Sequence, residues 1–146
     1  MRLLEPLSLG ARTAANRVMF GPPGSAYVYF TYGMHYLLNI VTEEEGRPCA
    51  VLIRAIEPLE GLAVMRARRP VQDKNLTDGP AKLCQALGIN KLFNGWNMTN
   101  GEKLWVEEYK KIARHEVSRT PRIGIGYAEK KDREALWRFC VKNDNR

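Results

Sequence analysis

The longest run of β-forming residues extends from Ala26 to Ile40 and is broken near its middle by Gly33. Tyr, Val, Phe, Thr, Leu and Ile favour a pleated, half-buried surface, and a glycine supplies the backbone freedom that a chain reversal needs. We therefore predict two antiparallel strands joined by a tight loop, with Tyr32, Gly33 and Met34 at its tip. Tyr and Met are unusual at an exposed turn, because they leave apolar surface with no core to enter.

The hydrophobic pattern predicts a third strand over 49–56, which ends at Glu57-Pro58 because proline disfavours ladder pairing. It predicts a helix over 59–69 and a second, capped helix over 78–88, with Pro80 in its first turn and Gly88 at its end. Three further short strands are predicted at 104–106, 123–126 and 136–141.

Basic side chains within these elements have open interpretations. Arg54 would emerge on one face of the third strand, where a guanidinium needs a carboxylate, a carbonyl or a phosphate. The start of the second helix offers free N–H groups beside Lys82, which fits either a phosphate contact or a plain structural helix. The arginines at the end of the first helix, Arg66, Arg68 and Arg69, fit a solvated helix terminus or a phosphate contact.

Composition narrows the class of partner. The 146 residues fit one domain, and the 23 Lys plus Arg against 16 Asp plus Glu give a net charge of +7. This excess favours a polyanion such as nucleic acid, although it also serves solubility alone. On a basic protein, an apolar tip such as that of the 26–40 hairpin suggests a wedge that enters between stacked bases.

Cysteine and histidine usage indicates neither a disulfide framework nor a metal site. Cys49, Cys84 and Cys140 are odd in number and far apart, and His35 and His115 stand alone. We expect reduced, buried thiols in a cytoplasmic protein with no metal and no cofactor. No apolar run is long enough to span a bilayer, so no membrane association is expected.

Several blocks, in order along the chain, carry a family resemblance. They are 16–20 (NRVMF), 27–29 (YVY), 32–34 (YGM), 39–40 (NI), 51–61 (VLIRAIEPLEG), 79–87 (GPAKLCQAL), 122–126 (RIGIG) and 137–139 (WRF). Together they resemble the alkyladenine (3-methyladenine) DNA glycosylase family. The resemblance implies a single α+β domain over 1–146, with a mostly antiparallel curved sheet, a protruding β-hairpin and a few short helices.

The resemblance also implies an activity and a set of roles. Such an enzyme flips a damaged purine out of duplex DNA and hydrolyses the bond between base and sugar. Tyr32 matches the tyrosine that fills the gap, and Met34 supports it in the minor groove. The base pocket would contain Tyr29, which stacks on the base, Asn39, which discriminates against guanine, and Arg54, beside the nucleotide. Double-stranded DNA with damaged purines is the implied partner, and we expect a monomer.

The register of the hairpin decides whether the pocket residues can meet. A two-residue loop would pair Thr31 with Met34 and place Tyr29 and Asn39 on opposite faces. An odd-length loop centred on Gly33 brings four side chains to one face, because a one-residue slip reverses every side chain: Tyr27, Tyr29, His35 and Asn39. We predict the odd-length loop, and with it His35 as a further pocket residue.

The chain departs from the family where hydrolysis would be carried out. The family's activating Glu lies in a V-E-(T/V)-E-A-Y segment that precedes the block matched here by Asn16, so we expect it to be absent and assign no catalytic residue. A fragment or misplaced start is the explanation we favour. A degenerate homologue that binds lesions without cutting and a substitute carboxylate are the other two. A damaged-DNA-binding module and an RNA-binding domain therefore remain alternative functions.

Overall fold

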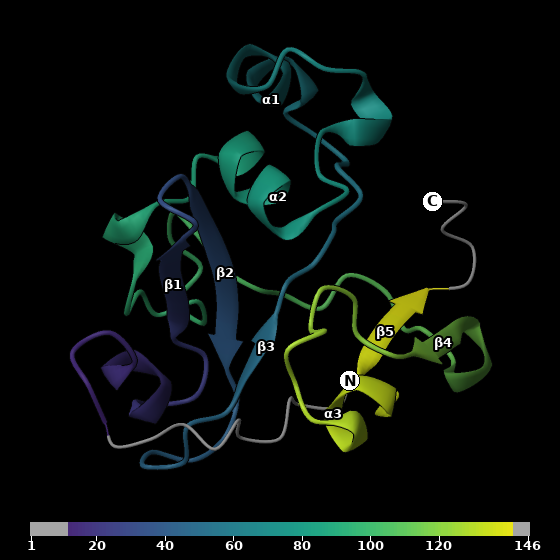
Figure 1. Ribbon diagram of the computed structural model, residues 1–146. Coiled ribbons are helices and arrows are strands. Elements are labelled where there is room, and N and C mark those ends of the chain that lie inside the picture. Colours follow the sequence, from purple (N-terminus) through teal and green to yellow (C-terminus); the bar gives the residue numbers. More distant parts are fainter. Residues whose placement is uncertain (1–11, 142–146) are drawn as a thin grey trace. The chain divides into compact units, whose positions relative to one another are not determined.

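The computed structural model describes residues 12–141, which divide into two compact units, 12–106 and 107–141. The first contains a three-stranded antiparallel sheet in the order β1-β2-β3, with β1 at Ala26–Thr31, β2 at His35–Val41 and β3 at Ala50–Leu52 (Figure 1). Two α-helices accompany it, α1 at Leu62–Arg68 and α2 at Pro80–Leu87. Its 3-10 turns are Arg17–Phe20, Asp73–Asn75 and Lys91–Phe93.

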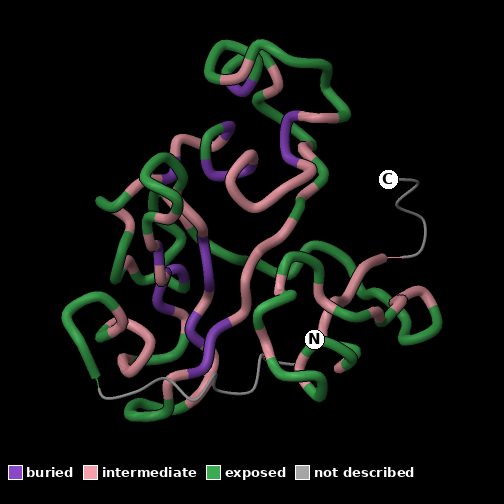
Figure 2. Tube along the Cα trace, viewed as in Figure 1, coloured by how far each residue is buried: buried purple, intermediate pink, exposed green. Residues whose placement is uncertain are grey.

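The core of the first unit lies between one face of the sheet and α2. Alternate residues of β1 and β2 point to the same face, so Ala26, Val28 and Leu38 are buried together. Leu83 of α2 is fully buried against them. Figure 2 shows buried positions following β1, β2 and α2. A smaller cluster holds α1 to α2 through three buried side chains, Met65, Leu76 and Ala86.

The segment after η3, the 3-10 turn Lys91–Phe93, covers the free edge of β1. The backbone N–H of Ala26 donates to the Trp96 carbonyl at 2.8 Å, and that of Gly95 donates to the Ala26 carbonyl at 2.8 Å. Asn94 adds a side-chain acceptor, since its Oδ1 receives the Val28 N–H at 3.0 Å. The strand that carries the hairpin is therefore hydrogen-bonded on both sides.

The second unit contains an antiparallel pair, β4 at Val117–Thr120 and β5 at Arg138–Val141, with α3 at Lys130–Glu134 and a 3-10 turn at Arg114–Glu116. Arginines lie over its aromatic rings. The Arg122 guanidinium is 5.0 Å from the centre of the Trp137 ring. None of the helices between residues 12 and 141 is long and apolar enough to cross a membrane.

The structure confirms the α+β class with antiparallel sheets and changes several boundaries. The third strand covers only Ala50–Leu52. The Ile53 N–H still donates to the Leu38 carbonyl of β2, whereas the Ile56 N–H donates to the Thr77 carbonyl outside the sheet. The first helix begins at Leu62, since Gly61 adopts a left-handed φ of 72°. The second helix is confirmed, with Gly79 as its N-cap and Gly88 ending it at φ 72°.

Two predicted strands are wrong. Residues 104–106 form no ladder, and within 123–126 Gly124 has a φ of 81°, which no extended strand permits. The strand predicted over 136–141 exists as β5, and its partner β4 lies in a segment that was not predicted. The prediction of one domain over 1–146, without the family's catalytic segment, stays a prediction.

Candidate nucleic-acid interface

The hairpin has the odd-length loop that was predicted. Thr31 pairs with His35, Tyr29 with Leu37 and Tyr27 with Asn39, which leaves three residues in the loop. The Met34 N–H donates to the Thr31 carbonyl at 3.2 Å and closes the turn. This register puts Tyr27, Tyr29 and Asn39 on one face, as a shared pocket requires.

Tyr32 projects from the tip in a strained backbone conformation. Its φ is 52° and that of the following Gly33 is 68°. Two successive positive φ values are typical of type I′ hairpin turns, where Asn or Asp followed by Gly is preferred. A tyrosine there costs backbone energy, and its side chain is 85% exposed, so burial does not offset that cost. Met34, two residues on, is 68% exposed.

The predicted pocket face combines aromatic rings with a buried amide. The Tyr27 and Tyr29 rings lie 5.3 Å apart, tilted by 31°. Asn39 is 6% exposed, and its Nδ2 donates to the Tyr27 carbonyl at 3.2 Å, which holds the amide on this face. Burial raises the pKa of the Tyr27 hydroxyl. Tyr29 and Asn39 therefore share a face, and their roles toward a base stay predictions.

Arg54 lies just beyond β3 and is partly buried. Within residues 12–141 its guanidinium makes no hydrogen bond and no ion pair. Five N–H donors without a protein acceptor suit a phosphate or a nucleotide edge. Its role beside a flipped nucleotide stays a prediction.

Lys82 is engaged by a carboxylate. Its Nζ donates to Asp78 Oδ1 at 2.8 Å, one turn back at the start of α2. The hydrogen bond from Lys82 lowers the pKa of the Asp78 carboxyl. Lys82 is 44% exposed and its ammonium has three N–H donors, so a phosphate contact, which stays a prediction, would share Lys82 with Asp78.

The α1 arginines show an arrangement that neither open interpretation described. Arg66 forms a two-pronged pair with Asp73, with nitrogen–oxygen distances of 2.7 and 2.5 Å. Arg68 Nη1 donates to the Ala86 carbonyl near the end of α2 at 3.1 Å. Arg69 Nη1 donates to Gln85 Oε1 at 2.7 Å. These guanidiniums connect the helices of the unit through acceptors that the sequence did not reveal.

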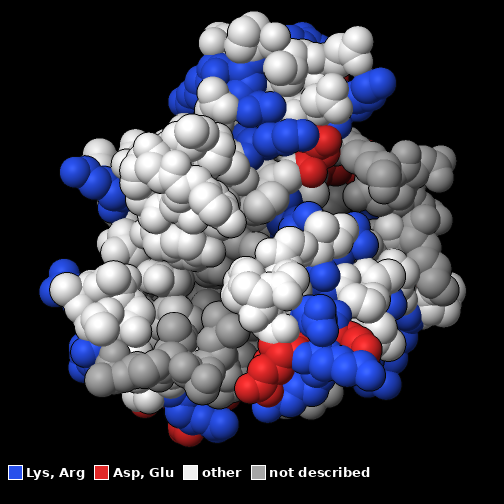
Figure 3. All heavy atoms as spheres, viewed as in Figure 1, with Lys and Arg blue, Asp and Glu red and all other residues white. Residues whose placement is uncertain are grey.

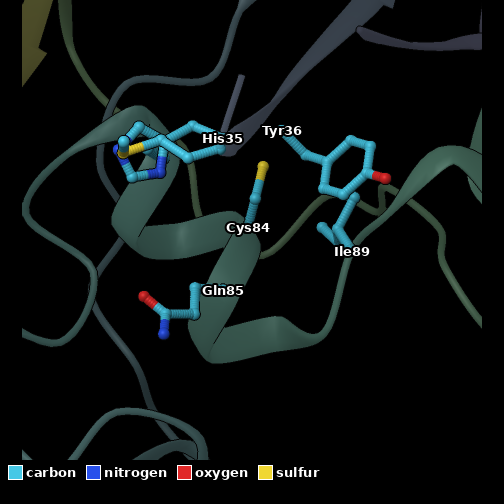
Figure 4. A pocket seen from close by; sticks show the side chains of 7 residues that line it. His35, Tyr36, Cys84, Gln85 and Ile89 are labelled. Carbon is cyan, nitrogen blue, oxygen red and sulfur yellow. The ribbon is translucent and has the colours of Figure 1, made fainter. Parts of the chain in front are cut away.

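His35 borders a cavity on the α2 side of the hairpin. The cavity has a volume of about 250 Å³, and Met34, Tyr36 and Cys84 also line it. Figure 4 shows the Cys84 side chain pointing into the space between His35 and Tyr36. The strand register also places His35 on the same face of the sheet as Tyr29. Its role in the base pocket stays a prediction.

The positive charge of the protein is divided between its two units. Lys and Arg exceed Asp and Glu by three in residues 12–106 and by three in 107–141, so neither unit carries all the excess. Figure 3 shows basic side chains spread over the face in view.

Cys49 and Cys84 are buried and free, as predicted, and burial raises the pKa of Cys84 to about 11. Cys140 is free and only partly buried.

Comparison with known proteins decides the family. A sequence model described as Methylpurine-DNA glycosylase (MPG) matches residues 7–145. The chain belongs to this family. Curated relatives bear the name "Putative 3-methyladenine DNA glycosylase". The one from Clostridium acetobutylicum is 44% identical and matches 92% of this chain and 69% of its own length. The relative from Chlorobaculum parvum is 48% identical, with 88% and 60% covered. The relative from Methanocella arvoryzae is 47% identical and matches 90% of this chain and 65% of its own length.

This result confirms the predicted resemblance and the class of enzyme, a DNA N-glycosylase that acts in repair. The chain spans between 60% and 69% of the length of these three relatives. One exposed aromatic residue beside the tip was missed. Phe30 is 53% exposed, and the period-two alternation of β1 could have placed it on the face opposite Tyr29.

Proposed function

We propose that this protein is a base-excision glycosylase that flips alkylated or deaminated purines of the 3-methyladenine type from double-stranded DNA and removes them hydrolytically. The observation that carries the proposal is Tyr32, an exposed aromatic ring on a strained hairpin turn. Backbone strain that no packing offsets is a mark of functional positions. A ring in this setting has the size and polarity to replace an expelled base in the stack.

The steps follow the order in which the surfaces meet the duplex. Extruding a base costs a few kcal/mol, and stacking on an aromatic ring returns about 1–3 kcal/mol per base. Tyr32 would stack in the space that the extruded base has left. Met34 would support it in the minor groove. Tyr29 would stack on the extruded purine. The Asn39 amide, which donates a hydrogen bond to the Tyr27 carbonyl, would disfavour binding of guanine through its exocyclic amino group.

Arg54 would lie next to the flipped nucleotide, where its free N–H donors can bind a phosphate oxygen and hold the nucleotide in the pocket. A water then replaces the base at the sugar carbon. None of the residues assigned here activates that water. We propose that the protein acts as a monomer in the cytoplasm, the reducing compartment in which buried free thiols such as Cys84 persist.

A duplex carrying one hypoxanthine tests the proposal against an undamaged duplex of the same sequence. Binding is measured by titration and release of free base by chromatography. We expect preferential binding, base release, and a 5- to 150-fold weaker lesion complex for Tyr32→Ala, the range that about 1–3 kcal/mol of stacking predicts. Tyr127→Ala is the control, because Tyr127 is equally exposed at 84% in the other unit. Equal affinity for both duplexes would refute lesion recognition, and binding without release would refute hydrolysis.

A further inference from the structure

The cavity beside His35 lies on the reverse of the predicted lesion pocket. Strand alternation sends Tyr29 and Asn39 to one face and Phe30 and Tyr36 to the other. Tyr36 lines the cavity, and α2 supplies its opposite wall. A ligand in this cavity would therefore be a different group from the flipped purine.

Aromatic surface leads from the hairpin tip into this cavity. The Phe30 ring is 53% exposed and lies 4.9 Å from the Tyr36 ring, tilted by 47°. Met34, also exposed, lines the cavity on the loop side. Rings and a thioether at an open surface form a platform on which a planar heterocycle can stack, whatever its sequence identity.

The polar groups of the cavity suit an uncharged ring with a hydrogen-bonding edge. None of its lining residues is acidic. The Gln85 amide is held at both ends, since its Oε1 accepts from Arg69 and its Nε2 donates to the Arg68 carbonyl. The His35 backbone pairs with Thr31, but its ring makes no hydrogen bond within residues 12–141, so the ring nitrogens are available to a ligand. Cys84, at 1% exposure, is buried beneath them.

Size restricts the ligand further. The cavity of about 250 Å³ is smaller than the 300–1,000 Å³ common for small-molecule sites. One nucleobase is a ligand of suitable size and chemistry. We propose that this cavity is a second nucleotide site, which takes an unpaired base from the strand opposite the flipped purine. The inference rests on the proposed function, because a duplex opened by Tyr32 presents such a base at the hairpin tip.

Filling the cavity tests the inference. Ala81→Leu adds bulk on the α2 wall, and Ala63→Leu is the matched control on the exposed side of α1. Each variant is titrated with two hypoxanthine duplexes, one with a normal base opposite the lesion and one with an abasic nucleotide there. We expect Ala81→Leu to weaken binding of the first duplex at least fivefold and to leave the second unchanged. Ala63→Leu should alter neither.

Equal losses on both duplexes, or no loss on either, would overturn the second site. Gln85→Ala, at an exposed lining position outside the predicted lesion pocket, provides the same comparison if Ala81→Leu does not fold, and it should show the same dependence on the opposite base. The wild-type protein separates the two proposals. If it does not prefer hypoxanthine over undamaged duplex, both fail. If it does prefer hypoxanthine but neither variant responds to the opposite base, only the second site fails.

Discussion

Replacing Tyr32 by asparagine should stabilise the fold while it weakens lesion binding. Tyr32 has a φ of 52° at the first central position of the hairpin turn. The left-handed region costs an ordinary residue roughly 1–2 kcal/mol, and asparagine tolerates it far better because its short side chain bonds locally. The tyrosine ring is 85% exposed, so its removal sacrifices little buried area.

The net effect on folding is a gain of about 0.5–1 kcal/mol, the part of the left-handed strain that asparagine relieves. Tyr32→Gly relieves more strain but should gain less, because glycine adds roughly 0.5–1 kcal/mol of unfolded-state entropy. Urea unfolding measures both values, with Tyr127→Asn as the control, since Tyr127 is as exposed and its φ is not positive. In the same preparations, affinity for a hypoxanthine duplex should fall about 5- to 150-fold with Tyr32→Asn.

A loss of more than about 1 kcal/mol on Tyr32→Asn would refute this reasoning, because a loss of that size indicates a side chain packed in the fold. The ring would then be a structural element, and its place at the tip would no longer argue for insertion. An unchanged affinity for the lesion duplex would refute the functional half independently. The free energy of unfolding and the affinity for the lesion duplex together distinguish a strained residue that serves binding from a residue that is packed in the fold.

Three further predictions concern the supports of the site. Arg54→Ala should weaken lesion-duplex binding about tenfold in titrations and shift the urea midpoint little, because Arg54 has no hydrogen bond within residues 12–141 to lose. Asp78 has a pKa below its ordinary 3.8, chiefly through Lys82, so the pair stabilises the fold above that pH and stops doing so as the pH falls through the lowered pKa; Asp78→Asn should flatten this part of an acid unfolding curve. Asn94→Ala leaves the buried Val28 N–H without its acceptor and should cost about 1–3 kcal/mol in urea unfolding.

The hairpin could be predicted from the sequence because its signal is local and repeated. Alternating residues from Ala26 to Ile40 define two strands, and the requirement that Tyr29 and Asn39 share a face selects one register. The second helix could be predicted for the same reason, since Pro80 and Gly88 mark its ends. In both elements the signal lies within a short stretch of chain, 15 residues for the hairpin and 11 for the second helix.

The errors occurred where distant residues decide the structure. The strand predicted over 49–56 does not reach Ile56, whose N–H finds its acceptor at the Thr77 carbonyl, 21 positions along the chain. The acceptors of Arg68 and Arg69 at Ala86 and Gln85 are equally remote. Local periodicity carries no information about such partners, so it offered solvent or phosphate where the fold supplies carbonyl and amide oxygens.

The hairpin projects at its tip and is hydrogen-bonded to the rest of the unit at its base. Ala26, at the start of β1, exchanges hydrogen bonds with Gly95 and Trp96, while β2 is held between β1 and β3. The tip itself is closed by the bond from the Met34 N–H to the Thr31 carbonyl. A wedge must withstand the force of a duplex that restacks, and a strand bonded on both edges resists that force better than a loop. Tyr32, the strained residue, directly follows Thr31, whose pairing with His35 is the last rung of the β1–β2 ladder.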